Sequence, residues 1–339
     1  MNISAAKRRW IFWLLIIAFI WLLVSRFTEV EKLVRTLALG QWQWIGAAAL
    51  LQGAYYLIVT WHYQTAFSAV ELPRCFWHLL PVVFVALFLN VVVPTGGMGV
   101  AGPALFVDDA ERQGLPPGRA VAATLLALVT DYAAFTLVLI VGLVYLFFEH
   151  DLSTYVIVGS IILMLLSTGL TILLLLGLWE PAFLARLLIW FQRAIDHLAT
   201  RLHRHSPLTA DWSQKLSGEF ETAAAAIERN LSKCLGTFCI SLGSYAVDIV
   251  SLYVLFVAFR QPIGFGALVA GFAVGIVFWI VSITPEGIGV VEGVMTLVYT
   301  SLGIPAEAST LVALSFRGLT FWLPLGIGFL MVHRIRSLE

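Results

Sequence analysis

The stretch PTGGMGVAG at residues 94–102 interrupts one long apolar run, and TPEGIGVVEG at residues 284–293 interrupts another in the second half of the chain. A short turn follows each, Gly-Leu-Pro at 114–116 or Gly-Ile-Pro at 303–305, and a further apolar run begins. Proline removes a backbone donor, and glycine permits conformations that other residues avoid. We therefore expect these segments, the first break and the second break, to end one helix and begin another. The expected hinge residues are Pro94, Gly96, Gly97 and Gly99 in the first break and Pro285, Gly287 and Gly289 in the second.

The composition is that of a membrane protein. Of 339 residues, 60% are hydrophobic and 12% are charged, and the mean hydropathy is +0.93. Soluble domains carry about 25% charged residues. Apolar runs near the length of roughly 20 residues that spans a bilayer recur from end to end. We therefore predict an all-α fold, a single polytopic transmembrane helix bundle over residues 1–339. The runs lie near 10–25, 42–61, 78–93, 119–148, 154–178, 233–259, 264–283 and 306–332.

The positive charges predict the orientation of the chain. If each unit that contains a break, 78–107 and 264–301, enters the membrane and returns to its own side, fifteen Lys and Arg residues share one face with both termini and four lie on the other. Cytoplasmic loops carry an excess of Lys and Arg. We therefore expect a multi-pass protein of the cytoplasmic (inner) membrane with both termini in the cytoplasm. Two full crossings would instead separate the basic 180–232 loop from the basic C-terminus, so re-entrant units are favoured.

The two re-entrant units would enter from opposite faces, as in an inverted-topology repeat. The first repeat half is expected at about 42–178 and the second at about 233–332. The cytoplasmic loop between them, 180–232, has leucines and arginines at helical spacing. This pattern fits either ordinary packing beside the membrane or an amphipathic helix that binds anionic lipid. Broken helices at corresponding positions of two halves point to the substrate site of a transporter.

Ionisable residues inside the apolar runs are the candidate functional residues, because each costs about 2.5–3.5 kcal/mol or more at the bilayer centre. Arg317 lies inside the last run, and Asp131 has a roughly equivalent place in the first half. We expect Arg317 to pair with Asp131 or with a glutamate of the second break. Either Arg317 is a counter-ion for buried acid, or its planar fork of donors binds a lipid phosphate. The candidate substrate-binding residues are Arg317, Glu286, Glu292, Asp131 and Asn90, and Asp248 is a further acid inside a run.

Signals for catalysis or cofactor binding are weak. Residues 97–102 match the Gly-x-Gly-x-x-Gly dinucleotide fingerprint, but that motif needs a βαβ unit and here it lies between bilayer-length apolar runs. No His, Cys or Asp set has metal-ligand spacing. The net charge of zero gives no indication of nucleic-acid binding. We therefore expect no cofactor, no metal, no nucleic-acid partner and no enzymatic activity.

The break segments resemble the two signatures of a known family. VPTGGMG at 93–99, with the run that continues to Asp131, resembles the first signature of the lysylphosphatidylglycerol synthase transmembrane-region family, also called flippase-like or UPF0104 membrane proteins. PEGIGVVE at 285–292, followed by RGLTFWLP at 317–324, resembles the second. The first signature often has an arginine in the span after the break, where this chain has VTDY at 129–132. Arg317 is therefore expected to act alone.

The resemblance implies a lipid-handling membrane protein. In two-domain members this region moves aminoacylated phosphatidylglycerol between leaflets, and a separate soluble domain makes that lipid. We expect this chain to be a stand-alone member without the synthase domain. The leading hypothesis is a flippase-like translocase for an anionic or aminoacylated lipid, or for a lipid-linked intermediate. The alternatives are an integral-membrane enzyme acting on a lipid or polyprenyl-phosphate, and a non-catalytic accessory subunit of a lipid-synthesising partner enzyme.

Overall fold

The computed structural model describes residues 36–92, 101–149, 225–282 and 287–331, together with positions 165, 168, 169, 172, 218, 222 and 223. Within these residues all regular structure is helical, which confirms the predicted all-α bundle. The runs expected near 10–25 and 154–178, and most of the 180–232 loop, lie outside the described residues. Four helical stretches are long and apolar enough to cross a membrane: Trp42–Ala69, Pro117–Tyr145, Leu231–Ala258 and Ala306–Met331.

The helices fall into two groups of the same order. The first group is α3 (Trp42–Ala69), α4 (Phe76–Val92), α5 (Ala101–Arg112) and α6 (Pro117–Glu149). The second is α10 (Leu231–Ala258), α11 (Phe265–Val281), α12 (Val290–Ser301) and a last span in three parts, α13 (Ala306–Arg317), the π-helical segment η2 (Gly318–Trp322) and α14 (Leu323–Met331).

The two groups repeat one pattern at a constant interval of 189 residues. The first three helices of each group have 28, 17 and 12 residues. The turn glycines with positive φ, Gly114 and Gly303, keep the same interval. The repeat is therefore explicit in the helix bounds, where the sequence alone shows only a modest likeness. The helix starts that differ by 189 are Trp42 and Leu231, Phe76 and Phe265, Ala101 and Val290, and Pro117 and Ala306.

The helices α4 and α5 form an antiparallel hairpin around the first break. Near the start of α4, His78 Nε2 lies 3.1 Å from Oδ2 of Asp109, which is near the end of α5. At the other end of the hairpin, the Gly102 N–H donates to Asn90 Oδ1 at 2.8 Å. The 17 residues of α4 are fewer than the roughly 20 that a full crossing needs. This geometry is the one expected of a re-entrant unit.

The helices α11 and α12 form the corresponding hairpin around the second break. The Tyr299 hydroxyl, near the end of α12, donates to the Leu268 carbonyl near the start of α11 at 3.2 Å. At the opposite end, Gly287 lies against Trp279, and a Cβ on this glycine would be 3.3 Å from the Trp279 Cα. The second unit therefore also returns toward the side from which it started.

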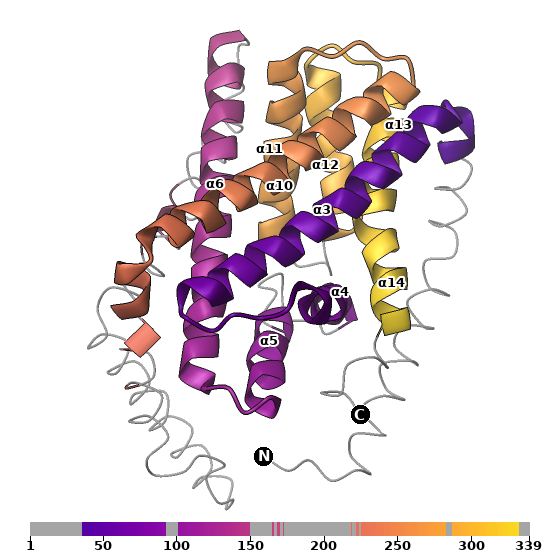
Figure 1. Cartoon of the computed structure of the whole chain (residues 1–339). Coiled ribbons are helices and arrows are strands. Elements are labelled where there is room, and N and C mark those ends of the chain that lie inside the picture. Colours follow the sequence, from indigo (N-terminus) through magenta and orange to yellow (C-terminus); the bar gives the residue numbers. More distant parts are fainter. Residues whose placement is uncertain are drawn as a thin grey trace, which may run out of the picture.

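The contact between α3 and α10 shows how the two halves are oriented. The side chain of Lys233, near the start of α10, donates to the Ser68 carbonyl near the end of α3 at 3.1 Å. Gln52 in the first half of α3 contacts Asp248 in the second half of α10. The helices α3 and α10 therefore pack antiparallel, side by side across the molecule (Figure 1). Because they occupy corresponding places in the repeat, the two halves have inverted orientations, as predicted.

The two halves are interlocked through their last long helices. The helix α6 packs along α11, and α14 packs along α4. Two glycines allow these close approaches: Gly142 of α6 lies against Ala270 and Ala273 of α11, and Gly328 of α14 lies against the backbone of Phe84 in α4. Figure 1 shows α5 near one end of the bundle and α11 and α12 near the other, with α6 running past both levels. Each hairpin therefore packs against the last span of the other half.

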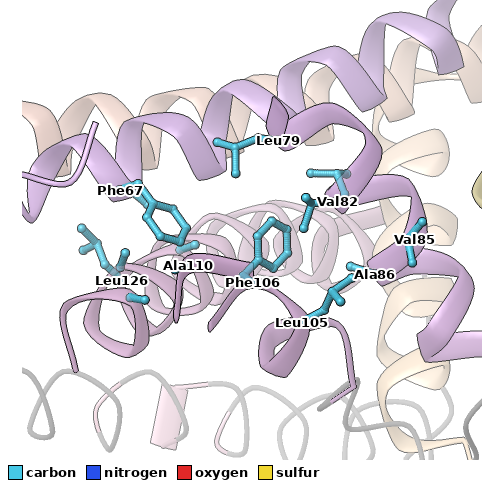
Figure 2. Packing of buried hydrophobic residues seen from close by; sticks show 14 of the residues in the cluster. Phe67, Leu79, Val82, Val85, Ala86, Leu105, Phe106, Ala110 and Leu126 are labelled. Atoms are coloured by element: carbon cyan, nitrogen blue, oxygen red, sulfur yellow. The ribbon is translucent and has the colours of Figure 1, made fainter. Parts of the chain in front are cut away.

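An apolar cluster fills the space between the first hairpin and the long helices α3 and α6. In this cluster Phe106 of α5 stacks on Tyr63 of α3, with ring centroids 4.1 Å apart. An ion pair between Arg74 and Asp109, both buried, closes the cluster near the start of α4. Figure 2 labels Phe67, Leu79, Val82, Val85, Ala86, Leu105, Phe106, Ala110 and Leu126 of this cluster.

Candidate functional site

The second break leads into α12 through two glycines in the left-handed region. Gly287 has a φ of +69° and Gly289 a φ of +80°, values that residues with a Cβ rarely adopt. Glu292 follows in the first turn of α12, and its Oε2 accepts the Gly289 N–H at 2.7 Å. The first N–H groups of a helix have no partner within the helix. The Glu292 carboxylate satisfies one such donor and places a negative charge where the helix dipole favours it.

Arg317 lies at the end of α13 and contacts the same carboxylate. Its Nε donates to Glu292 Oε1 at 3.3 Å, and the two side chains are 12% and 16% exposed. The Arg317 guanidinium also lies over the ring of Phe321, 5.6 Å from the centroid. Of the partners expected for Arg317, the structure therefore brings Glu292 to it. One carboxylate both caps α12 and holds the arginine of α13.

The helix changes pitch immediately after Arg317. Residues Gly318–Trp322 form a π-helical turn between α13 and α14. Such turns are rare in proteins and occur frequently at functional sites. Here the Thr320 carbonyl accepts a hydrogen bond from the Tyr56 hydroxyl of α3 at 3.2 Å. The turn is therefore tied to the helix pair at the centre of the bundle.

Asp131 lies elsewhere and does not pair with Arg317. Its carboxylate accepts hydrogen bonds from the Ser241 hydroxyl at 2.9 Å and from the Tyr245 hydroxyl at 3.3 Å, both on α10. Of the two kinds of partner expected for Arg317, the structure therefore shows a glutamate and not Asp131. The repeat interval also shows that Asp131 and Arg317 are not corresponding positions. A shift of 189 residues places Leu128 at the position that corresponds to Arg317. The acid lies almost one helical turn further along α6, where it faces α10.

Asn90 of α4 accepts a backbone N–H across the first break, whereas Glu292 accepts one at the start of its own helix, α12. Asn90 accepts the Gly102 N–H at the start of α5, and a Cβ on Gly102 would be 3.0 Å from its side-chain amide. The first hairpin is therefore capped by a neutral group and the second by a charged one. Among the other expected site and hinge residues, Pro94, Gly96, Gly97, Gly99, Pro285 and Glu286 lie outside the described residues.

The similarity to known proteins extends over nearly the whole chain. Residues 10–328 match the family described as the lysylphosphatidylglycerol synthase TM region. The chain belongs to this family. A UPF0104 membrane protein of Pyrococcus horikoshii is 21% identical over 320 residues, which are 91% of this chain and 92% of that protein. A UPF0104 membrane protein of Methanocaldococcus jannaschii is 23% identical over 328 residues, 95% of this chain and 94% of that protein.

In this member of the lysylphosphatidylglycerol synthase transmembrane-region family, Asp248 has a partner, Gln52, that the sequence analysis did not name. Gln52 and Asp248 meet between α3 and α10, where the Gln52 Nε2 donates to Asp248 Oδ1 at 2.7 Å. A signal for it exists in the sequence. The buried polar residues of α10 recur at alternating spacings of four and three, which indicates one buried helix face. They are Thr237, Ser241, Ser244, Asp248 and Ser251.

Proposed function

We propose that this protein moves an anionic or aminoacylated lipid, or a lipid-linked intermediate, between the leaflets of the cytoplasmic membrane. The observation that carries the proposal is the inverted repeat with its two broken hairpins. In transporters built from inverted repeats, broken helices at the repeat interface form the substrate site. Membership of a lipid-related membrane family is consistent with a lipid cargo.

The interlocked packing supports movement by rocking of one half against the other. Because α6 packs on α11 and α14 packs on α4, a tilt of either long helix moves the hairpin of the opposite half. The site would then open to one leaflet while it closes to the other. Lipid exchange needs no covalent step, and we propose transport rather than catalysis, with lipid-synthesising enzymes as partners that supply or consume the cargo.

Arg317 is the residue that we propose contacts the lipid phosphate. An arginine presents donors in a planar fork that suits phosphate oxygens. In the structure Glu292 holds this fork, so an incoming phosphate would compete with a carboxylate for the same guanidinium. Binding and release would then be an exchange of partners. Glu286 and Asp131 would adjust the charge around the pathway.

The orientation of the chain belongs to the same proposal. Arg74 precedes α4, Arg112 ends α5 and Arg119 lies at the start of α6, so three arginines lie at the open end of the first hairpin. We propose that this end faces the cytoplasm together with both termini, following the excess of Lys and Arg in cytoplasmic loops. The open end of the second hairpin would face the outside.

The test is lipid movement in reconstituted liposomes. Purified protein is incorporated with phosphatidylglycerol that carries a fluorescent acyl chain, and in a parallel arm with its lysylated form. Dithionite then reports the fraction of label that reaches the outer leaflet. We expect wild type to raise this fraction above that of empty liposomes. Arg317→Ala should slow movement about 10-fold or more, because a hydrogen bond to a charged group contributes about 1.5–3 kcal/mol. Arg317→Lys should fall between the two.

Arg112→Ala is the matched control. Arg112 is paired with Asp108 at 2.9 Å on an exposed face of α5, so this variant removes an arginine–carboxylate pair away from the second break. It should move lipid at the wild-type rate. If Arg317→Ala also keeps that rate, Arg317 is a structural counter-ion. If wild type moves neither lipid above the empty-liposome baseline, the transport proposal is wrong, and product formation in detergent micelles then tests for an enzyme.

A further inference from the structure

The contact between Gln52 and Asp248 lies at the centre of the inverted repeat. Gln52 is 0% exposed and Asp248 is 8% exposed, and they join α3 of the first half to α10 of the second. Gln52 corresponds to Ser241 after the shift of 189 residues, and Ser241 in turn donates to Asp131 of the first half. Two carboxyl groups, the partly buried Asp131 of the first half and the buried Asp248 of the second, therefore each contact corresponding positions of the opposite half.

The side-chain amide of Gln52 is only half satisfied. Its Nε2 donates to Asp248 Oδ1, but its Oε1 is buried and accepts no hydrogen bond from any residue that the structure describes. A buried acceptor without a donor is energetically unfavourable, so such groups in proteins nearly always have a partner. A carboxylate offers only acceptors, whereas a protonated carboxyl adds one O–H donor. The missing donor is the one that a proton on Asp248 would supply.

The surroundings of the two carboxyl groups contain neutral donors. Asp131 and Asp248 interact electrostatically with one another, and neither forms an ion pair within the described part of the chain. The helix α11 contributes no titratable residue, and the arginine of α13, Arg317, is held by Glu292. The titratable groups that interact with the two carboxyls are Tyr55 and Tyr63 on α3, Tyr132 on α6 and Tyr245 on α10.

Hydrogen bonding distinguishes the two acids. Among the residues that the structure describes, Asp131 accepts two hydrogen bonds, from Ser241 and Tyr245, whereas Asp248 accepts one, from Gln52. Hydrogen bonds donated to a carboxylate stabilise its charged form. Two carboxylates in one low-dielectric region disfavour double ionisation. A single proton shared between these acids therefore belongs on Asp248.

We propose that Asp248 and Gln52 form a proton-binding site. The Asp248 carboxylate takes one proton from the aqueous phase onto Oδ2, and no other bond is made or broken. The O–H then donates to Gln52 Oε1 while Gln52 Nε2 still donates to Oδ1, which gives a closed acid–amide ring with two hydrogen bonds. The ring joins the two halves. On the assumption that the protein moves lipid as proposed above, loss of this proton loosens the joint, and a proton gradient then drives the rocking motion.

Infrared spectroscopy of the full-length protein in nanodiscs tests the site without any measurement of transport. Wild type should show the C=O band of a protonated carboxyl group that disappears at high pH. Asp248→Asn should lose this band. Asn also preserves both hydrogen bonds to Gln52, so this variant should fold. Asp131→Asn should retain the band, and Gln52→Leu should shift its frequency because the C=O no longer accepts a hydrogen bond. A band that survives in Asp248→Asn overturns the proposal, as does its absence from wild type.

Proteoliposomes test the coupling. A transmembrane pH gradient should accelerate lipid movement by wild type and have no effect on Asp248→Asn. An equal sodium gradient at constant pH should leave the wild-type rate unchanged, and acceleration by sodium instead of protons overturns the proton assignment. If wild type moves lipid but ignores the pH gradient, the coupling is wrong and the transport proposal stands. If no lipid moves while the band behaves as expected, the transport proposal fails and the proton site stands.

Discussion

Tyr56 and Tyr245 occupy corresponding positions of the two halves and make corresponding contacts. Tyr56 donates to the Thr320 carbonyl and Tyr245 donates to the Asp131 carboxylate, and these two acceptor residues are themselves 189 positions apart. The two tyrosines thus join each half to the long helix of the other. Only one of the acceptors is an ionisable side chain. The repeat therefore preserves the position of the contact but not its acceptor, which is a backbone carbonyl of η2 in one case and the carboxylate of Asp131 on α6 in the other.

At the scale of single residues, Gly271→Ala should destabilise the protein. A Cβ on Gly271 would lie 2.3 Å from the ring of Tyr299, which is 0% exposed and fixed between α11 and α12. Overpacking of this kind costs about 1–3 kcal/mol. Thermal unfolding in detergent should show a lower Tm. Gly243→Ala on α10 is the matched control, because a Cβ there would have no atom of the described residues within 4 Å, and it should leave the Tm unchanged or raise it. Equal Tm values for the two variants would contradict the close packing of the second hairpin.

At the scale of single elements, the two hairpins differ in how their second helix begins. The helix α5 starts with a hydrogen bond to the amide of Asn90, whereas α12 starts with the carboxylate of Glu292. A helix N-terminus attracts negative charge because its unpaired N–H groups carry a partial positive charge. The charged cap, Glu292, therefore lies at the second break, where it also contacts Arg317. The neutral cap, Asn90, lies at the first break, whose residues 94–102 include no ionisable side chain.

The Asn90 cap can be tested by hydrogen exchange. Asn90→Leu removes the acceptor for the Gly102 N–H while it keeps a side chain of similar size. Loss of a helix cap costs about 0.5–2 kcal/mol, so the amides of the first turn of α5 should exchange faster. Asn90→Asp keeps an oxygen acceptor and should retain protection. Unchanged exchange at the start of α5 in Asn90→Leu would mean that the hairpin does not depend on this bond. Mass spectrometry of peptides that cover residues 101–112 measures the effect.

At the scale of the whole molecule, the interlocked halves should stay together when the chain is divided. Co-expression of residues 1–204 with residues 205–339 should give two pieces that co-purify, because α3 packs on α10, α6 on α11 and α14 on α4. A division between residues 244 and 245 lies inside α10, which has the most extensive packing with the first half, through α3. This division should abolish co-purification. Affinity purification through a tag on one piece measures the outcome. Independent purification of the first pair would contradict the interlock.

The class of the protein and the positions of both breaks follow from the residues alone, because apolar length and Pro/Gly content act locally. Runs of about 20 apolar residues form helices in a bilayer whatever their neighbours are. The charges then predicted hairpins that return to their own side. The positive φ of Gly287 and Gly289 and the start of α12 at Val290 follow from the residues of the second break.

Which polar residues meet depends on how the helices pack, and no local pattern in the chain shows it. Gln52 and Asp248 are 196 residues apart, and Arg317 had several acids within reach by sequence arguments. Sequence comparison also gave Asp131 a place roughly equivalent to that of Arg317, three positions away from the one that the interval of 189 establishes. A shift of three residues is almost one helical turn, so it moves a side chain about 4.5 Å along the helix and about 60° around it, which brings it to different neighbours. Partner choice depends on the packing angle and register of whole helices, and neither is encoded within the segments that form them.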